Sequence, residues 1–224
     1  KLTRVGVTGV VKPVLVHRNG KDNHLTARMD IFVDLPSTQR GSHMSRNIEV
    51  VTEMIDESIR AKVSSLEDLA AKICKELLDR HEYASFAEVR MSADYFLERK
   101  PDGGKTSLEQ FKLMAKATAM RGNGLMKQVG VEVTGMTACP CAQETVRQTM
   151  LAENPELEKF DGHLPVASHN QRNRTTLMVE VPEHVRVEAD DLISIVEGSI
   201  SSPTFGILKR GDEAAVVLAA HRNP

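Results

Sequence analysis

The sequence has 224 residues, of which 41% are hydrophobic and 27% charged, with a formal net charge of −2. Such a chain can bury a sizeable core as one large domain or two small ones. The balanced charge argues against a general nucleic-acid binder, and 4% aromatic residues argue against base stacking. The apolar runs are much shorter than the ~20 residues of a membrane span. Three cysteines fit a reducing cytoplasm better than a disulfide framework.

The first half of the chain predicts the order strand, strand, helix, helix, strand, strand. Apolar and polar residues alternate in the strands and recur every three or four residues in the helices. Asn47 and Ser65 precede the two helical stripes as expected caps, and Asp68 completes a capping box with Ser65. Tight turns are expected at Asn19–Gly20 and Pro101–Gly104. The expected elements are strands at 5–16, 24–35, 87–97 and 111–120, and helices from Ile48 and Leu66.

The second half repeats this pattern less cleanly. Strands are expected at 129–136 and 175–181, helices at 142–153, 192–199 and 212–220, and a loop at 154–165. An internal repeat of one supersecondary unit indicates two similar modules in tandem. Two further strands beyond Pro224 would be needed to complete the second copy, so we expect the C-terminal strands of that module to be absent.

Two of the three cysteines lie in Thr137-Ala138-Cys139-Pro140-Cys141. Together with His169 and Glu197 they offer thiolate, imidazole and carboxylate, the ligand set of a catalytic metal site with an open position. On an extended strand Cys139 and Cys141 would share one face about 6.6 Å apart, whereas two sulfurs on one tetrahedral ion lie within roughly 4 Å. One of them is therefore a candidate ligand, and spacing does not choose between them; the alternative is that both are small buried hydrophobes.

Each other candidate also has a structural alternative. Glu197 either lies on a solvated helix face or turns inward toward a metal, and Glu213 either binds a ligand or complements a helix dipole. His43 and Arg46 either cradle phosphate or belong to a capping loop. Gly41-Ser42-His43-Met44 is also the sequence left by cleavage of some affinity tags, but its internal position favours a native loop. Structural roles are expected for Cys74, as core filler, and for His81-Glu82-Tyr83.

Four motifs occur together and in order: Gly41-Ser42-His43-Met44-Ser45-Arg46, Gly135-Met136-Thr137-Ala138-Cys139-Pro140-Cys141, Ser168-His169-Asn170-Gln171-Arg172 and Leu208-Lys209-Arg210-Gly211-Asp212-Glu213. In these motifs the chain resembles the type IB GTP cyclohydrolase family, above all its archaeal methanopterin-pathway members. The resemblance implies an α+β tunnelling fold, with tandem modules at 1–124 and 125–224. Each module has an antiparallel sheet with paired helices on one face. It also implies a homotetramer with active sites at subunit interfaces.

The same resemblance implies roles for individual residues. Cys139, His169 and Glu197 would hold a divalent metal, Fe(II) in archaeal enzymes and Zn(II) or Mn(II) in relatives, and Cys139 and His169 would be catalytic. Glu213 would anchor the guanine ring. Arg172, with His43 and Arg46, is a candidate for the triphosphate because guanidinium groups and helix starts both bind phosphate.

The resemblance also implies the reaction. GTP would be hydrolysed with release of formate to a 7,8-dihydroneopterin phosphate, the first step of tetrahydromethanopterin or folate-type pterin synthesis. The archaeal branch implies the 2′,3′-cyclic phosphate, and the bacterial branch the triphosphate. The alternatives are another tunnelling-fold purine or pterin enzyme, which is not expected to carry these motifs, and a non-catalytic zinc-stabilised module. No nucleic-acid or membrane partner is expected, and the predicted location is cytoplasmic.

Overall fold

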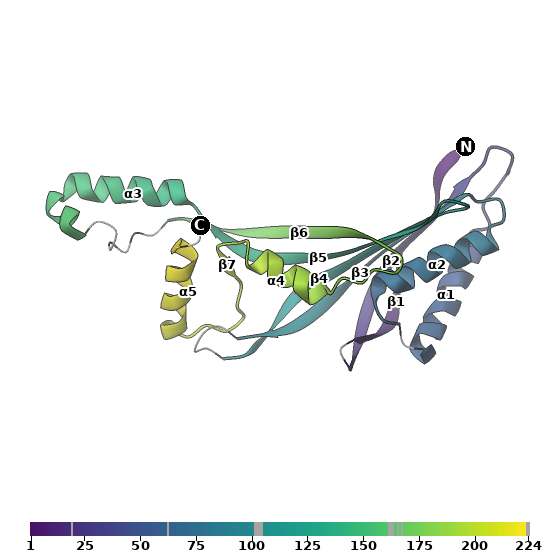
Figure 1. Cartoon of the computed structure of the whole chain (residues 1–224), viewed down its shortest axis with the longest axis horizontal. Helices are drawn as coiled ribbons and strands as arrows, with labels where there is room; N and C mark the ends of the chain where they lie inside the picture. The colour runs from purple at the N-terminus through teal and green to yellow at the C-terminus, as the bar shows by residue number, and fades with distance from the viewer. Residues whose placement is uncertain are drawn as a thin grey trace. The chain divides into compact units, whose positions relative to one another are not determined.

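The computed structural model describes residues 1–18, 20–61, 63–100, 105–160, 164, 166 and 168–222. Its elements (Figure 1) are β1 (Leu2–Arg18), β2 (Lys21–Leu35), α1 (Met44–Ala61), α2 (Leu66–Arg80), β3 (Phe86–Arg99), β4 (Ser107–Met120), β5 (Gly124–Ala138), α3 (Pro140–Glu153), the 3₁₀ helix η1 (Pro155–Phe160), β6 (Asn170–Pro182), α4 (Ala189–Glu197), β7 (Ser202–Pro203) and α5 (Arg210–Arg222). The order predicted for the first half is confirmed. The turn expected at Pro101–Gly104 lies outside the described residues.

The strands of the described ranges form one sheet in the order β1-β2-β3-β4-β5-β6, with β7 paired to β5. The pairs β1/β2, β2/β3, β4/β5 and β5/β7 are antiparallel. Met29 of β2 lies opposite Met91 of β3, and Leu113 of β4 lies opposite Val131 of β5. Each long strand therefore lies beside its predecessor in the sequence, as expected for antiparallel hairpins joined by helices.

The chain forms two compact units. The first contains residues 1–95, 111–132 and 176–192, and the second contains 96–110, 133–175 and 193–224. Each unit draws on several separate segments of the chain. The predicted tandem modules, 1–124 and 125–224, are continuous stretches of the chain, unlike these two units. The division into modules stays a prediction.

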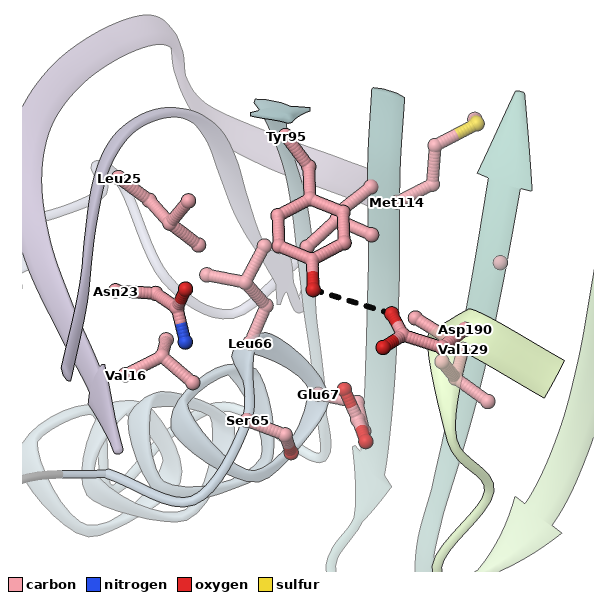
Figure 2. A pocket seen from close by; sticks show the side chains of 13 residues that line it. Val16, Asn23, Leu25, Ser65, Leu66, Glu67, Tyr95, Met114, Val129 and Asp190 are labelled. Carbon is pink, nitrogen blue, oxygen red and sulfur yellow. Dashed lines mark hydrogen bonds between the residues drawn. The ribbon is translucent and has the colours of Figure 1, made fainter. Parts of the chain in front are cut away.

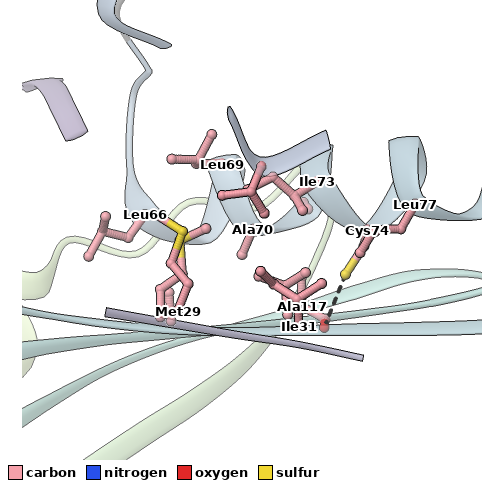
Figure 3. Packing of buried hydrophobic residues seen from close by; sticks show 14 of the residues in the cluster. Met29, Ile31, Leu66, Leu69, Ala70, Ile73, Cys74, Leu77 and Ala117 are labelled. Carbon is pink, nitrogen blue, oxygen red and sulfur yellow. Dashed lines mark hydrogen bonds between the residues drawn. The ribbon is translucent and has the colours of Figure 1, made fainter. Parts of the chain in front are cut away.

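The core of the first unit lies between the helix pair α1 and α2 and one face of its strands. Alternate residues of β2, among them Met29 and Ile31, are fully buried, and Ile73 and Leu77 of α2 pack over them (Figure 3). Each such side chain contributes about 1.5–3 kcal/mol on burial. Cys74 is fully buried beside them, and its thiol donates to the Ala117 carbonyl at 3.3 Å. Its predicted role as core filler is therefore confirmed.

Of the two helix caps expected in the first unit, Ser65 is confirmed and Asn47 is wrong. Ser65 caps α2 as predicted, because its Oγ accepts the N–H of Asp68 at 3.1 Å. The Asp68 carboxylate does not turn back to the cap; it accepts a hydrogen bond from Lys127 Nζ at 2.6 Å. Asn47 is not a cap, because α1 already begins at Met44. Its side chain is instead buried inside the fold.

The second unit has a smaller buried core. None of the side chains of α3 is buried, whereas Ile193 and Val196 of α4 are. The loop expected at 154–165 begins instead as the 3₁₀ helix η1, whose first residue, Pro155, has the fixed φ that suits the first position of a helix. No helix among the described residues is long and apolar enough to cross a membrane.

Candidate metal centre

Cys139 is the N-cap residue of α3. It follows β5 directly, has extended backbone angles of φ −106° and ψ 105°, and precedes Pro140, the first helical residue. Proline is favoured at that position because its missing N–H would have no partner there. Cys139 Sγ accepts the N–H of Ala142 at 3.4 Å and is half-buried, which leaves the thiol accessible at the helix start.

Cys141 occupies the first turn of α3 and is exposed. The assumption of an extended strand through both cysteines is therefore wrong, because the chain turns into a helix between them. The distance argument built on strand geometry does not apply to Cys141. Both cysteines are free thiols.

A hydrogen bond joins the chain just before β6 to the cap of α3. Ser168 Oγ accepts the N–H of Cys139 at 3.1 Å, and Thr137 Oγ1 donates to the carbonyl of Gln171 at 3.4 Å. His169 lies between these two contacts, directly before β6, with its side chain exposed. The backbone segments that carry Cys139 and His169 are thus adjacent in the second unit.

The segment after α4 is tied to the same place. Ser201 Oγ accepts the N–H of Ala138 at 2.9 Å. Gly135 lets the strands approach closely here, because a Cβ at this position would lie 2.1 Å from Ile200 Cδ1 and 3.1 Å from the Ser202 carbonyl oxygen. Two serine hydroxyls therefore connect β5 both to the His169 segment and to the chain that follows Glu197.

Glu197 is the last residue of α4, and its carboxylate is paired with Arg99 at the end of β3. Arg99 Nε lies 3.2 Å and 3.1 Å from the two carboxylate oxygens, and Nη2 lies 3.0 Å from Oε2. The Glu197 side chain is only 15% exposed. The carboxylate is therefore mostly shielded from solvent and faces the Arg99 guanidinium.

The structure does not gather the predicted ligands into one cluster. Within the part of the chain that it describes, no three His, Cys, Asp or Glu side chains lie close enough together to hold a metal ion. The donor chemistry nevertheless fits a divalent metal, because an accessible thiol, an exposed imidazole and an inward-turned carboxylate lie on connected segments. The assignment of Cys139, His169 and Glu197 as ligands stays a prediction.

Two predicted substrate-binding residues also belong to the second unit. Glu213 is exposed in the first turn of α5, where its N–H donates to the Lys209 carbonyl at 2.9 Å. Arg172 is exposed on β6. Both side chains are accessible from solvent, and neither role is tested by these contacts.

His43 and Arg46 belong to the first unit. His43 immediately precedes α1 and is exposed. Arg46 Nη1 donates to the carbonyl of Arg80 at 3.0 Å, so part of its guanidinium satisfies the C-terminal end of α2. The structural alternative for Arg46 was a capping loop, but Arg46 lies inside α1 and contacts the end of another helix.

His81, Asn47 and Tyr83 form a polar network close to His43 and Arg46. His81 is fully buried; its Nε2 lies 2.8 Å from Asn47 Oδ1 and its Nδ1 lies 2.9 Å from the Tyr83 hydroxyl. Burial lowers the pKa of His81, and the positive charge of Arg46 and the neighbouring His43 lower it further. The structural role expected for His81 and Tyr83 agrees with these contacts.

The first unit also contains a small cavity, shown in Figure 2. Tyr95 donates a hydrogen bond of 3.1 Å to Asp190 beside it, and Glu67 and Leu66 form part of its wall. Its volume of about 30 Å³ is enough for a water molecule but not for a nucleotide. This cavity is therefore not a substrate site.

Comparison with solved structures defines the class of fold. Uricase from Arthrobacter globiformis, a tunnelling-fold protein, superposes with a TM-score of 0.54 at 9% sequence identity, over 99% of this chain and 77% of that one. A hyper-thermostable variant of that uricase gives the same TM-score of 0.54 at 8% identity, over 100% of this chain and 76% of its own. The predicted α+β tunnelling fold is thereby confirmed.

Sequence comparison defines the family. The type I GTP cyclohydrolase folE2 family matches residues 1–224. GTP cyclohydrolase MptA of Methanothermobacter thermautotrophicus is 45% identical over 234 residues, covering 100% of this chain and 74% of its own. The Methanobrevibacter smithii protein of that name is 44% identical over 237 residues, covering 100% and 76%. The chain belongs to the type I GTP cyclohydrolase folE2 family, and its predicted class as a GTP cyclohydrolase of the archaeal branch is confirmed.

Arg99, Ser168 and Ser201 were not singled out from the sequence. Ser168 lies inside a motif that the sequence analysis quoted, but its hydrogen bond with the Cys139 N–H could not be read from the sequence. Arg99 and Glu197 are separated by 98 residues, and no local pattern links them.

Proposed function

We propose that this chain is a metal-dependent GTP cyclohydrolase whose metal is held by Cys139, His169 and Glu197. The observation that carries the proposal is the pair of serine hydrogen bonds at the end of β5. They join the end of β5 to the residue before His169 and to Ser201, which follows Glu197 by four residues. These contacts support a shared site by connecting the backbone segments, and the convergence of the three side chains on one metal is part of the proposal.

The donor set is one that Fe(II), Zn(II) and Mn(II) accept. Within that group we propose Fe(II), which the resemblance to archaeal members of the family implies. A divalent metal bound there would supply the Lewis acidity that makes water a nucleophile near neutral pH. His169 and Cys139 already have accessible side chains. Glu197 has to exchange its contact with Arg99 for the metal.

The remaining predicted residues would bind the substrate. Glu213 would accept hydrogen bonds from the guanine edge and fix the orientation of the ring. Arg172, with a planar guanidinium on an exposed strand, suits a phosphate oxygen pair. His43 and Arg46 would serve the triphosphate at the start of α1.

The reaction that follows is a double hydrolysis. Water adds to the imidazole carbon of guanine and the ring opens; a second water releases that carbon as formate, and the ribose then rearranges and closes as a dihydropterin. We propose the 7,8-dihydroneopterin 2′,3′-cyclic phosphate as the product, formed when the 2′-hydroxyl of the dihydropterin side chain attacks the α-phosphorus and diphosphate leaves. The curated relatives named above are archaeal MptA proteins, which favours this product. The reaction is then the first step of methanopterin synthesis. The bacterial-type triphosphate product is the second candidate.

We also propose a homotetramer. α3 has no buried side chain, and Val146 on it is 43% exposed; Leu218 of α5 is 48% exposed. A helix such as α3, with exposed apolar side chains and no buried face, is expected to contact another subunit. The cytoplasmic location predicted from the cysteine count stays a prediction.

Anaerobic incubation with GTP and Fe(II) tests this function. We expect formate and, after oxidation, a fluorescent pterin; phosphorus NMR separates the cyclic phosphate from the triphosphate. No turnover with Fe(II), Mn(II) or Zn(II) would reject the proposal. A non-catalytic zinc-stabilised module would instead unfold when a chelator removes the metal, whereas the enzyme should keep the core of its first unit.

A further inference from the structure

The carboxylate of Glu197 is fully engaged by a single arginine. Arg99 approaches as a fork, with Nε within 3.2 Å of Oε1 and 3.1 Å of Oε2, and Nη2 at 3.0 Å from Oε2. Both oxygens that a metal would use therefore already face a cation. Such charge-assisted, multiply bonded pairs are stronger than neutral hydrogen bonds.

The location of this pair requires a cation. Glu197 ends α4, where the negative end of the helix dipole disfavours a carboxylate. Its side chain is 15% exposed and that of Arg99 is 26% exposed, so water screens the charges only in part. Val196 and Ile193 of the same helix are buried. A lone carboxylate here would be unfavourable, and Arg99 compensates it.

We infer that Arg99 and the divalent metal compete for Glu197: Arg99 keeps the carboxylate paired in the metal-free protein and is displaced when the metal binds. The inference rests on the proposed function, which makes Glu197 a ligand. A dication bound to these oxygens would lie close to the guanidinium, and the two positive charges repel each other. Because coupling is reciprocal, whatever the metal does to the Arg99 contact, Arg99 does to metal affinity.

Arg99 is thus a positioning residue that sets metal affinity, not a catalytic residue. If the ion pair is merely structural, the loss of Arg99 should change the stability of the protein and leave its metal affinity unchanged. Competition predicts that its loss raises metal affinity. These two outcomes differ in a quantity that can be measured without turnover.

The test is titration of the metal-free full chain with Co(II), following the thiolate-to-cobalt absorption band that ligation by Cys139 would produce. Arg99→Gln removes the competing cation and should bind Co(II) about tenfold more tightly than the wild type. Arg99→Lys keeps the charge but loses the fork, so its affinity should lie between the two. Arg147→Gln is the matched control, because Arg147 forms an ion pair with Glu144 in the same unit, on α3.

Each outcome of the titration supports or overturns either the competition or the metal site itself. If Arg99→Gln binds Co(II) equally or less tightly while the wild type shows the band, competition is wrong and the metal site stands. If neither the wild type nor any variant shows the band, the proposed ligation by Cys139 fails, and the competition fails with it. If Arg99→Gln does not fold, Arg99→Lys carries the test, and an affinity no higher than that of the wild type overturns the inference.

Discussion

The backbone N–H of Cys139 donates a 3.1 Å hydrogen bond to the hydroxyl of Ser168, the residue directly before His169. This contact links the start of α3 to the start of β6. It places on neighbouring segments two residues that are well separated in the sequence. The orientation of the Cys139 backbone at the helix start therefore depends on a serine that is not itself a ligand.

Replacing Ser168 with alanine should weaken both the fold and the metal site. The N–H of Cys139 loses its partner, which costs about 1 kcal/mol of unfolding free energy, and we expect metal affinity to fall several-fold. Urea denaturation and competition with a chelator measure the two effects. Ser199→Ala is the control, because it removes a serine hydroxyl of the same unit that donates to the Ile195 carbonyl at 2.7 Å and does not contact the Cys139 backbone. Equal metal affinities in the two variants would contradict the expected role of Ser168.

Gly135→Ala should destabilise the second unit. The added Cβ would lie 2.1 Å from Ile200 Cδ1 and 3.1 Å from the Ser202 carbonyl oxygen, so either the side chain or the backbone must move. Overpacking of this kind costs about 1–3 kcal/mol. Gly41→Ala provides the comparison, since no atom lies within 4 Å of its Cβ position. Thermal unfolding measures both, and an unchanged melting temperature for Gly135→Ala would show that β5 and the 200–202 segment are not closely packed.

Asp68→Ala should destabilise the first unit strongly, because it leaves a buried cation without a partner. Lys127 is 1% exposed and its Nζ lies 2.6 Å from Asp68 Oδ1. Removing one partner of a buried ion pair costs about 3 kcal/mol, against less than about 1 kcal/mol at an exposed pair. Glu144→Ala, which removes the partner of Arg147 on α3, supplies the exposed comparison. Similar losses in urea denaturation would mean that the charge of Lys127 is not effectively buried.

Stability should fall as the pH drops below neutrality because of His81. Its folded-state pKa is lowered by burial, then by Arg46 and His43, so the unfolded chain takes up a proton first. The contribution of neutral His81 is therefore complete above the unfolded pKa of about 6.5 and is lost as pH falls toward the folded value. Unfolding free energies measured from pH 7.5 to 5 should decline more steeply in the wild type than in His81→Gln. Parallel profiles would assign the pH dependence to other groups.

Local signals in the sequence predicted much of the fold. Ser65 was identified as a cap because the cap and its partner are three residues apart, and the alternation of β2 matches its buried face. Asn47 was misassigned because the apolar stripe of α1 becomes visible only at Ile48, whereas the helix begins at Met44. The first turn contains one apolar residue, Met44, which was assigned to the preceding loop.

The candidate site was predictable only in part. Cys139, His169 and Glu197 were named through motif resemblance, and no periodicity could have brought them together. Arg99 was missed because its pairing with Glu197 spans 98 residues. It forms only when tertiary folding brings the end of β3 next to the end of α4. The capping role of Arg46 was missed for a similar reason, since Arg80 lies on another helix. Contacts of this kind follow from tertiary packing and not from local sequence.

The most direct test of the central claim is the metal content of the purified chain after anaerobic reconstitution with Fe(II). We expect about one metal per chain in the wild type and in Cys141→Ser, and almost none in Cys139→Ser, with circular dichroism unchanged in all three. The exposed Cys141 is the matched control for the half-buried Cys139. Full metal content in Cys139→Ser would contradict the assignment of Cys139 as the thiolate ligand of this site.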